Sequence, residues 1–228
     1  MLYTQFNTVV CGLLQQLGLG VNADMIGESG FCTVTVGSTE IELVGTQQGF
    51  INLFCFPGTG APLSLSAPAL ALLMAINRYQ QSAPAVTVSI LSGSPAKLML
   101  WSRLALTEAN PATLGNLFAR FTDVSQVVQA WLKAGAPSPG STKSQSTMAR
   151  LQSLNRSPLF NKKETEADQV QPLPNPHSSR GSSLESIAAR YRIQLGSKGG
   201  QEQSAQFIQR AMNQESGLSL LMKQLNGA

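Results

Sequence analysis

The chain has 228 residues, a net charge of +4 and 43% hydrophobic residues, which allows one or two domains. It contains no apolar run of 18 residues, so we expect no transmembrane helix and no membrane insertion. Residues 1–135 contain eleven aromatic residues and have a net charge of −1. Residues 136–228 contain three aromatic residues and have a net charge of +5. We therefore expect a folded domain over 1–135 and a flexible, basic tail rich in Ser, Gln and Pro over 136–228.

The first third of the chain predicts a helix followed by three strands. Apolar residues recur at three- and four-residue steps over 2–17, which indicates a helix with a wide apolar face that ends at the glycines 18 and 20. Alternating patterns predict strands over 31–36, 40–44 and 50–56. The third of these strands is apolar on both faces. Either helices bury both faces, or a helix on one side leaves the other face in need of cover by a partner.

The rest of the domain predicts a helix, two strands and a closing helix. These elements are expected over residues 67–80, 85–91, 97–106 and 111–132. Ser66 or Ser64 is a candidate N-cap of the first helix, and Asn110 followed by Pro111 is a strong start signal for the second. The resulting order, α-β-β-β-α-β-β-α, predicts an α+β domain with an antiparallel sheet.

The tail predicts short helices between linkers. Residues 134–147 and 169–183 are rich in Pro, Gly, Ser and Ala or Gln and read as linkers. The remaining segments with apolar periodicity are residues 182–195, with a capping box at Ser182-x-x-Glu185, and residues 203–212 and 216–225. Each is too short to be stable alone in water, so we expect a largely disordered tail whose short helices order only when they dock.

The chemistry of the side chains argues against an enzyme. The only histidine, His177, lies in the tail, which excludes a Ser-His-Asp or Cys-His arrangement within the domain. Cys11, Cys32 and Cys55 sit in apolar segments without metal-ligand spacing, so we expect buried, reduced thiols and neither a metal nor a cofactor. The basic residues of the tail are dispersed with few aromatic residues among them, which disfavours nucleic acid as a partner.

The order of elements and several local patterns resemble the class I type III secretion chaperones, the Tir-chaperone family. The opening helix Phe6–Leu17 ends in Leu-Gly, and Gly30-Phe31-Cys32-Thr33-Val34 resembles the first strand of the family. Leu70-x-x-Leu73-Met74-x-x-Asn77 resembles the middle helix. A strand over Leu98–Leu104 then precedes the helix Phe118–Trp131, which has a late Trp. The resemblance covers residues 1–133.

The resemblance implies a non-enzymatic binding protein. Members are small homodimers of the Gram-negative cytoplasm that hold the N-terminal chaperone-binding segment of a secreted effector in an extended, export-competent state. Such a segment adds backbone pairing at sheet edges and lays apolar side chains into surface patches. The resemblance also implies the type III export apparatus as a further possible binding partner.

The resemblance also implies two sets of contact residues. The effector-contacting candidates lie on the first helix and the sheet: Leu2, Phe6, Val9, Leu13, Val34, Val36, Ile41, Leu43 and Phe54. The dimer candidates lie on the middle helix and the late strands: Leu70, Leu73, Met74, Asn77, Leu98, Leu100 and Trp101.

Two features depart from the family, whose members are usually acidic and stop near the end of the third helix. This chain is basic and continues over residues 136–228. Its tail could fold back over the effector groove as a placeholder, dock on the export apparatus or a regulator, or represent a fused binding segment of a partner. An alternative function is therefore a chaperone-fold regulator of secretion or transcription that acts through its tail.

Overall fold

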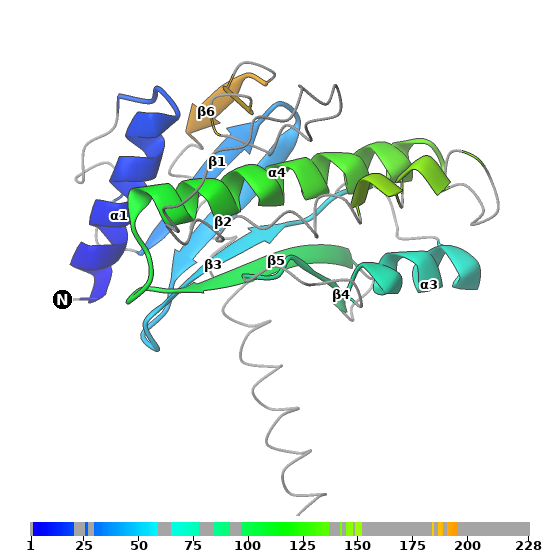
Figure 1. Cartoon of the computed structure of the whole chain (residues 1–228), viewed down its shortest axis with the longest axis horizontal. Helices are drawn as coiled ribbons and strands as arrows, with labels where there is room; N and C mark the ends of the chain where they lie inside the picture. Colours follow the sequence, from blue (N-terminus) through cyan, green and yellow to red (C-terminus); the bar gives the residue numbers. More distant parts are fainter. Residues whose placement is uncertain are drawn as a thin grey trace, which may run out of the picture.

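The computed structural model describes most of the domain and several short parts of the tail (Figure 1). The residues that it describes are 2–20, 26, 30–58, 65–77, 84–91, 97–136, 142, 145–147, 149–151, 184, 187–188 and 191–195. The helices predicted over 203–212 and 216–225, and the linker predicted over 169–183, lie outside these residues.

A single antiparallel sheet forms one layer of the molecule. Its strands are β1 (Phe31–Val36), β2 (Thr39–Gly45), β3 (Phe50–Cys55), β4 (Thr87–Leu91), β5 (Lys97–Ala105) and β6 (Ile193–Leu195). They lie in the order β4-β5-β3-β2-β1-β6, and every neighbouring pair is antiparallel. The fold is therefore of the α+β class, and the strands predicted within the domain are confirmed with ends that differ by one or two residues.

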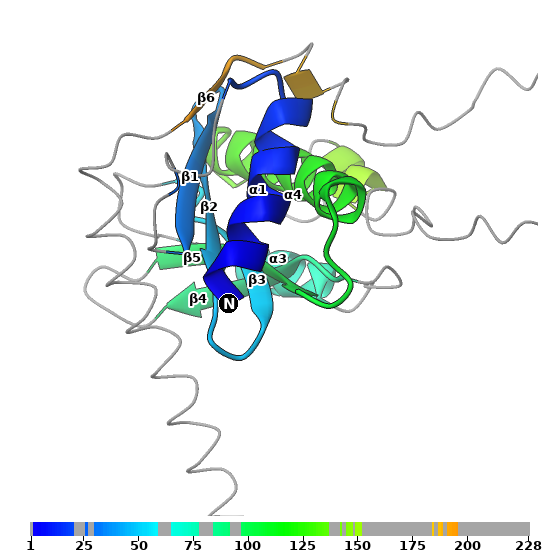
Figure 2. The same ribbon diagram turned by 90° about the vertical axis from the view of Figure 1, so that its left-hand side faces the viewer.

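Two helices cover one face of the sheet, and a third lies at its end. The helices are α1 (Leu2–Gln16), α3 (Ala67–Ile76) and α4 (Pro111–Lys133). Figure 2 shows α1 and α4 on the same side of the sheet, whereas α3 lies beside β4 in Figure 1. No helix among the described residues is both long enough and apolar enough to cross a membrane.

The helix ends follow the predicted capping signals. The Asn110 side chain accepts a hydrogen bond from the Thr113 amide, and the Thr113 hydroxyl accepts one from the Asn110 amide, so α4 begins with a capping box. Ser66, one of the two predicted caps, accepts from the Ala69 amide at the start of α3. That helix ends at Ile76, whereas the sequence predicts a helix to residue 80; residues 78–80 lie outside the described part.

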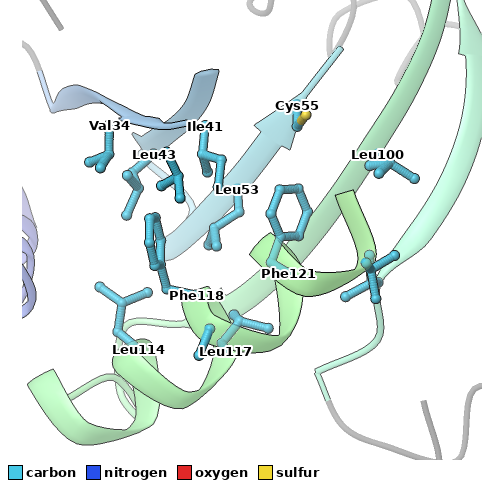
Figure 3. Packing of buried hydrophobic residues seen from close by; sticks show 14 of the residues in the cluster. Val34, Ile41, Leu43, Leu53, Cys55, Leu100, Leu114, Leu117, Phe118 and Phe121 are labelled. Atoms are coloured by element: carbon cyan, nitrogen blue, oxygen red, sulfur yellow. The ribbon is translucent and has the colours of Figure 1, made fainter. Parts of the chain in front are cut away.

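The main core lies between the sheet and the two covering helices. Alternate residues of the strands, such as Ile41, Leu53 and Leu100, point toward Phe118 and Phe121 of α4 (Figure 3). All five side chains are completely buried. Burial of an aromatic or aliphatic side chain of this size stabilises the fold by roughly 1.5–3 kcal/mol, so this layer supplies most of the stability.

A smaller apolar cluster lies on the opposite face of the sheet. It consists of Phe31, Val44, Phe54 and Met99, with the half-buried Phe56, Leu91 and Trp101 packed against it. Beside it, the Arg103 guanidinium lies 5.0 Å from the centre of the Phe50 ring and donates to the Asn52 side chain at 3.1 Å. The prediction that the third strand is apolar on both faces is confirmed, because Ile51 and Leu53 face the main core instead.

One prediction for the tail is wrong. The sequence predicts a helix over 182–195, yet residues 193–195 form β6 and pair with β1. A helical turn does occur upstream, where the Tyr191 amide donates to the Ile187 carbonyl at 3.0 Å. The edge of the sheet overrides the local helical pattern, because the free backbone groups of β1 offer hydrogen bonds that a short isolated helix lacks in water. Leu151 and Ile187 are also buried, so the core extends past residue 136.

Candidate protein-binding site

The β1 edge of the sheet carries an extended segment of the tail. Val34 lies opposite Leu195, Thr35 opposite Gln194, and Val36 opposite Ile193. Directly opposed residues in an antiparallel pair point to the same face, so Ile193 and Leu195 join Val34 and Val36 above the main core. This edge therefore accepts both backbone hydrogen bonds and alternate apolar side chains from an extended peptide.

The turn between β1 and β2 continues this pairing. The Gly37 amide donates to the Arg192 carbonyl at 2.9 Å. Gly37 has a φ of +63°, a conformation that L side chains rarely adopt, and a Cβ there would lie 3.5 Å from the Tyr191 ring. The turn thus presents an amide to the segment and leaves room for an aromatic side chain beside it.

Two helices form the rest of the seat. A Cβ at Gly115 of α4 would lie only 2.5 Å from Leu184 Cδ1 and 3.0 Å from Gln16 Oε1 at the end of α1. Glycine therefore creates the space that Leu184 fills. Ile187, one helical turn further along, is 0% exposed within the main core. We call the described residues of this stretch, 184, 187–188 and 191–195, the docked segment, and β1, Gly37 and Gly115 its seat.

Side chains of α4 hold the β1–β2 hairpin in place. Gln126 Nε2 donates to the Val36 carbonyl at 3.0 Å and to Thr39 Oγ1 at 3.1 Å. The Thr39 hydroxyl in turn donates to Gln129 Oε1 at 2.8 Å. These bonds join the seat to the core helix without using the docked segment, so the edge is organised by the domain itself.

The structure places the predicted effector-contacting residues mainly inside the chain. The side chains of Phe6, Val9, Leu13, Val34, Val36, Ile41, Leu43 and Phe54 are all buried, and that of Leu2 lies outside the description. In this state they offer no side-chain surface to a partner. Val34 and Val36 instead offer their backbone, which is where the docked segment pairs. Their contact with an effector stays a prediction.

The predicted dimer residues gather around α3 and the adjacent strands. Leu73, Leu98 and Leu100 are buried, whereas Leu70, Met74, Asn77 and Trp101 are half-buried. Asn77 has an internal role as well, because its side chain donates to the Val88 carbonyl at 2.9 Å and accepts from the Val88 amide at 2.8 Å. Trp101 Nε1 donates to Ser89 Oγ at 3.0 Å.

The helix α3 carries apolar side chains all the way round. Its sequence, APALALLMAI, contains no charged or polar side chain, and Leu72 is half-buried like Leu70 and Met74. On the neighbouring strand, Ile90 is 38% exposed, the one large hydrophobic residue so exposed among the described residues. A helix that is hydrophobic all round is normally covered on all sides.

The thiols of the domain are not poised for chemistry. Cys11, Cys32 and Cys55 are free and buried, as the sequence predicts. Burial raises the pKa of Cys32 and of Cys55 to about 12, so both thiols are protonated at neutral pH and neither is a ready nucleophile. Among the described residues, no three His, Cys, Asp or Glu side chains converge as a metal site would require.

One buried cation was not foreseen from the sequence. Arg120 of α4 is 1% exposed and donates through Nη2 to the Pro84 carbonyl, while Nε and Nη1 have no hydrogen-bond partner in the structure described. Burial lowers the pKa of Arg120 to about 10, which still leaves it charged at neutral pH. The sequence offers no signal for this, because the neighbouring positions of α4 carry the expected apolar stripe.

Sequence reasoning also missed the residues that build the seat. The sequence patterns did not single out Gly37, Gly115, Gln126 or Gln129 as part of a binding site. A signal for Gly115 was available, since a glycine inside a long helix often marks a close approach by another element. A scan against models of known protein families found no match, and neither did a search of curated protein sequences.

Proposed function

We propose that this protein is a non-enzymatic chaperone of type III secretion. It binds the N-terminal chaperone-binding segment of a secreted effector in the bacterial cytoplasm and keeps it export-competent. The observation that carries the proposal is the β1 edge, which holds an extended apolar segment through backbone pairing and side-chain seats. That is the mode in which a sheet edge binds peptides with little dependence on their exact sequence.

The order of the first eight described elements supports the same proposal. Helix, three strands, helix, two strands and helix follow one another along the chain, and the closing helix lies over the sheet. This is the order that the resemblance to the Tir-chaperone family implies. The specific chaperone fold is part of the proposal.

The proposal includes a homodimer formed through α3 and β4. The half-buried Leu70, Leu72 and Met74 of α3 and the exposed Ile90 of β4 form a surface that a second copy of the same helix and strand would cover. A symmetric dimer needs one self-complementary patch of this kind. The expected mass in light scattering is twice the 24.2 kDa of the chain.

Charged substitutions test the dimer. Met74→Glu combined with Ile90→Glu should convert the protein into a monomer without loss of helical content, because both side chains are partly exposed in the single chain. Gln194→Glu, an exposed position at the opposite end of the sheet, is the matched control. A wild-type protein that is monomeric at micromolar concentration would contradict this part of the proposal.

The secretion function is tested in the native bacterium. Deletion of the gene should remove one or a few proteins from the culture supernatant, while the other secreted proteins remain. The N-terminal segment of a lost protein should bind the purified chain, and removal of that segment should abolish both binding and secretion. An unchanged set of secreted proteins would contradict the proposal.

A second candidate function is a chaperone-fold regulator that acts through its tail. The docked segment favours it to a limited degree, because it shows that the tail contacts the domain. A regulator should change the transcripts or the secretion of many proteins on deletion, and its gene should lie within an apparatus operon. An escort chaperone should affect one client, with the effector gene next to its own.

A further inference from the structure

We infer that the docked segment is a built-in occupant of the partner-binding edge, and that a partner must displace it with a segment of the same pattern. This inference rests on the proposed function for the identity of the partner. The pattern consists of two apolar residues three apart, an aromatic residue four further on, and two alternating apolar residues in an extended stretch. In this chain they are Leu184, Ile187, Tyr191, Ile193 and Leu195.

The docked segment is held in a way that suits an exchangeable ligand. Its strand pairs with β1 over three residues only, and it lies at the very edge of the sheet. Four of its five apolar side chains are half-buried, and Ile187 alone is fully enclosed. Release therefore breaks one edge of the sheet and leaves the pairing of β1 with β2 intact.

The seat exists without the segment. Gln126 binds the Val36 carbonyl and Thr39 from the core side of the hairpin. The space at Gly115 and the positive φ at Gly37 are properties of the domain backbone. Release of the segment then uncovers the β1 strand edge and the apolar side chains that Ile187, Ile193 and Leu195 cover, a surface expected to attract another extended peptide.

The length of the connection sets how strongly the segment competes. Residues 152–183 separate it from the last described residue of the preceding helical stretch, Leu151. A tether of this kind gives an effective concentration on the order of mM. Against an intrinsic dissociation constant of about 10–100 μM for so short a segment, the occupied edge lowers the apparent affinity for a partner by roughly 10–100-fold.

The test uses a labelled peptide with the sequence of residues 182–197 as the probe and the full-length chain as the receptor. Binding is measured by fluorescence anisotropy for the wild type and for Ile187→Asp combined with Ile193→Asp. These substitutions expel the docked segment and leave every residue of the seat unchanged. We expect the variant to bind the peptide roughly 10–100-fold more tightly than the wild type.

Matched variants separate the seat from the segment. Gln194→Asp places one aspartate on the exposed side of the same strand and should bind like the wild type. Gly115→Leu added to the double variant fills the space that Leu184 occupies and should abolish the gain. A peptide in which the residues corresponding to Ile187 and Ile193 are aspartate should not bind any of the proteins.

Three results would overturn the inference. The first is equal peptide binding by the wild type and the double variant. The second is a double variant that has lost its cooperative thermal transition, which would make the segment an obligatory part of the core. The third is a wild-type oligomer that dissociates in the double variant, which would mean that the segment is exchanged between copies. Because the probe comes from this chain, success here alongside an unchanged secretome would refute the proposed function alone.

Discussion

The main core and the docked segment both bury apolar side chains against the same sheet, but they do so in different ways. In the main core, Phe118 and Phe121 of α4 are fully enclosed by side chains from three or more strands. The docked segment has one enclosed residue, Ile187, and is otherwise half-buried along a single edge. The first arrangement defines the fold, whereas the second is reversible. The burial of a single side chain therefore does not show whether it belongs to the permanent core or to a segment that can leave.

The largest expected effect breaks the main core and both regions with it. Phe121→Ala should lower the free energy of unfolding by about 3–5 kcal/mol, because it leaves a cavity between α4 and the sheet that the surrounding structure fills only in part. Chemical denaturation followed by circular dichroism measures the change. Ala130→Ser, at an exposed position of the same helix, is the control and should shift stability by less than about 0.5 kcal/mol.

A pH titration of the stability tests whether water reaches the two buried thiols of the same core. Burial raises the pKa of Cys32 and of Cys55 from the ordinary value of 9.0 to about 12, so the unfolded chain releases these protons at a lower pH than the folded chain does. The contribution of these two protonated thiols to the free energy of unfolding is fully present below pH 9 and is lost as the pH rises toward 12. The loss from the two thiols between pH 8 and pH 10 should be about 2–3 kcal/mol.

The control for the titration is Cys32→Ala combined with Cys55→Ala. This variant is less stable at pH 8 but should lose less stability on going to pH 10 than the wild type does. An identical pH slope for the two proteins would show that the thiols are accessible to water in the folded state.

A charge at the docked segment should have a limited effect. Ile187→Asp should lower the free energy of unfolding by at most about 1–3 kcal/mol, which is the free energy of docking itself. Once the segment has left the domain, the substituted residue cannot destabilise the fold any further. Phe121→Asp should prevent folding, since a buried carboxylate cannot be released from the core in this way. An equally severe effect of the two substitutions, measured by thermal unfolding, would contradict the distinction between the two regions.

The smallest effect concerns the hairpin that joins the two regions. Gln126→Ala removes the bonds to the Val36 carbonyl and Thr39 and should lower stability by about 1 kcal/mol. Because the seat loses its support, the affinity for the peptide of residues 182–197 should fall as well. Lys133→Ala removes only an exposed 3.4 Å contact to Ser38 and should change neither quantity. Unchanged peptide binding by Gln126→Ala would show that the hairpin needs no support from α4.

The sequence predicted the elements of the domain because local signals and tertiary packing agree there. Asn110 and Pro111 mark the start of α4, and the alternation over residues 31–36 marks β1. It did not predict β6, because Leu195 continues the helical spacing of Leu184, Ile187 and Tyr191, and the segment extends only when an edge strand is offered. Propensity within a short segment carries no information about a partner strand so far away in the chain.

Edge pairing with an effector segment stays a prediction. What the β1 edge carries in this structure is an extended segment of the chain's own tail. The apolar residues named for contact, such as Phe6 and Leu43, proved to be core, because a pattern that marks an apolar face does not say what covers it. Gly115 is needed because it has no side chain, and the space that this leaves is filled by Leu184, a residue far away in the sequence.

Native-state hydrogen exchange measures the difference between the two regions most directly. The amide of Gly37 donates to the Arg192 carbonyl across the edge, whereas the amides of β3 lie between two paired strands. If the docked segment is exchangeable, Gly37 should exchange through a local opening of low free energy that hardly depends on denaturant, and β3 only through global unfolding. Exchange of Gly37 and β3 with the same free energy and the same denaturant dependence would contradict the claim that the segment leaves the edge on its own.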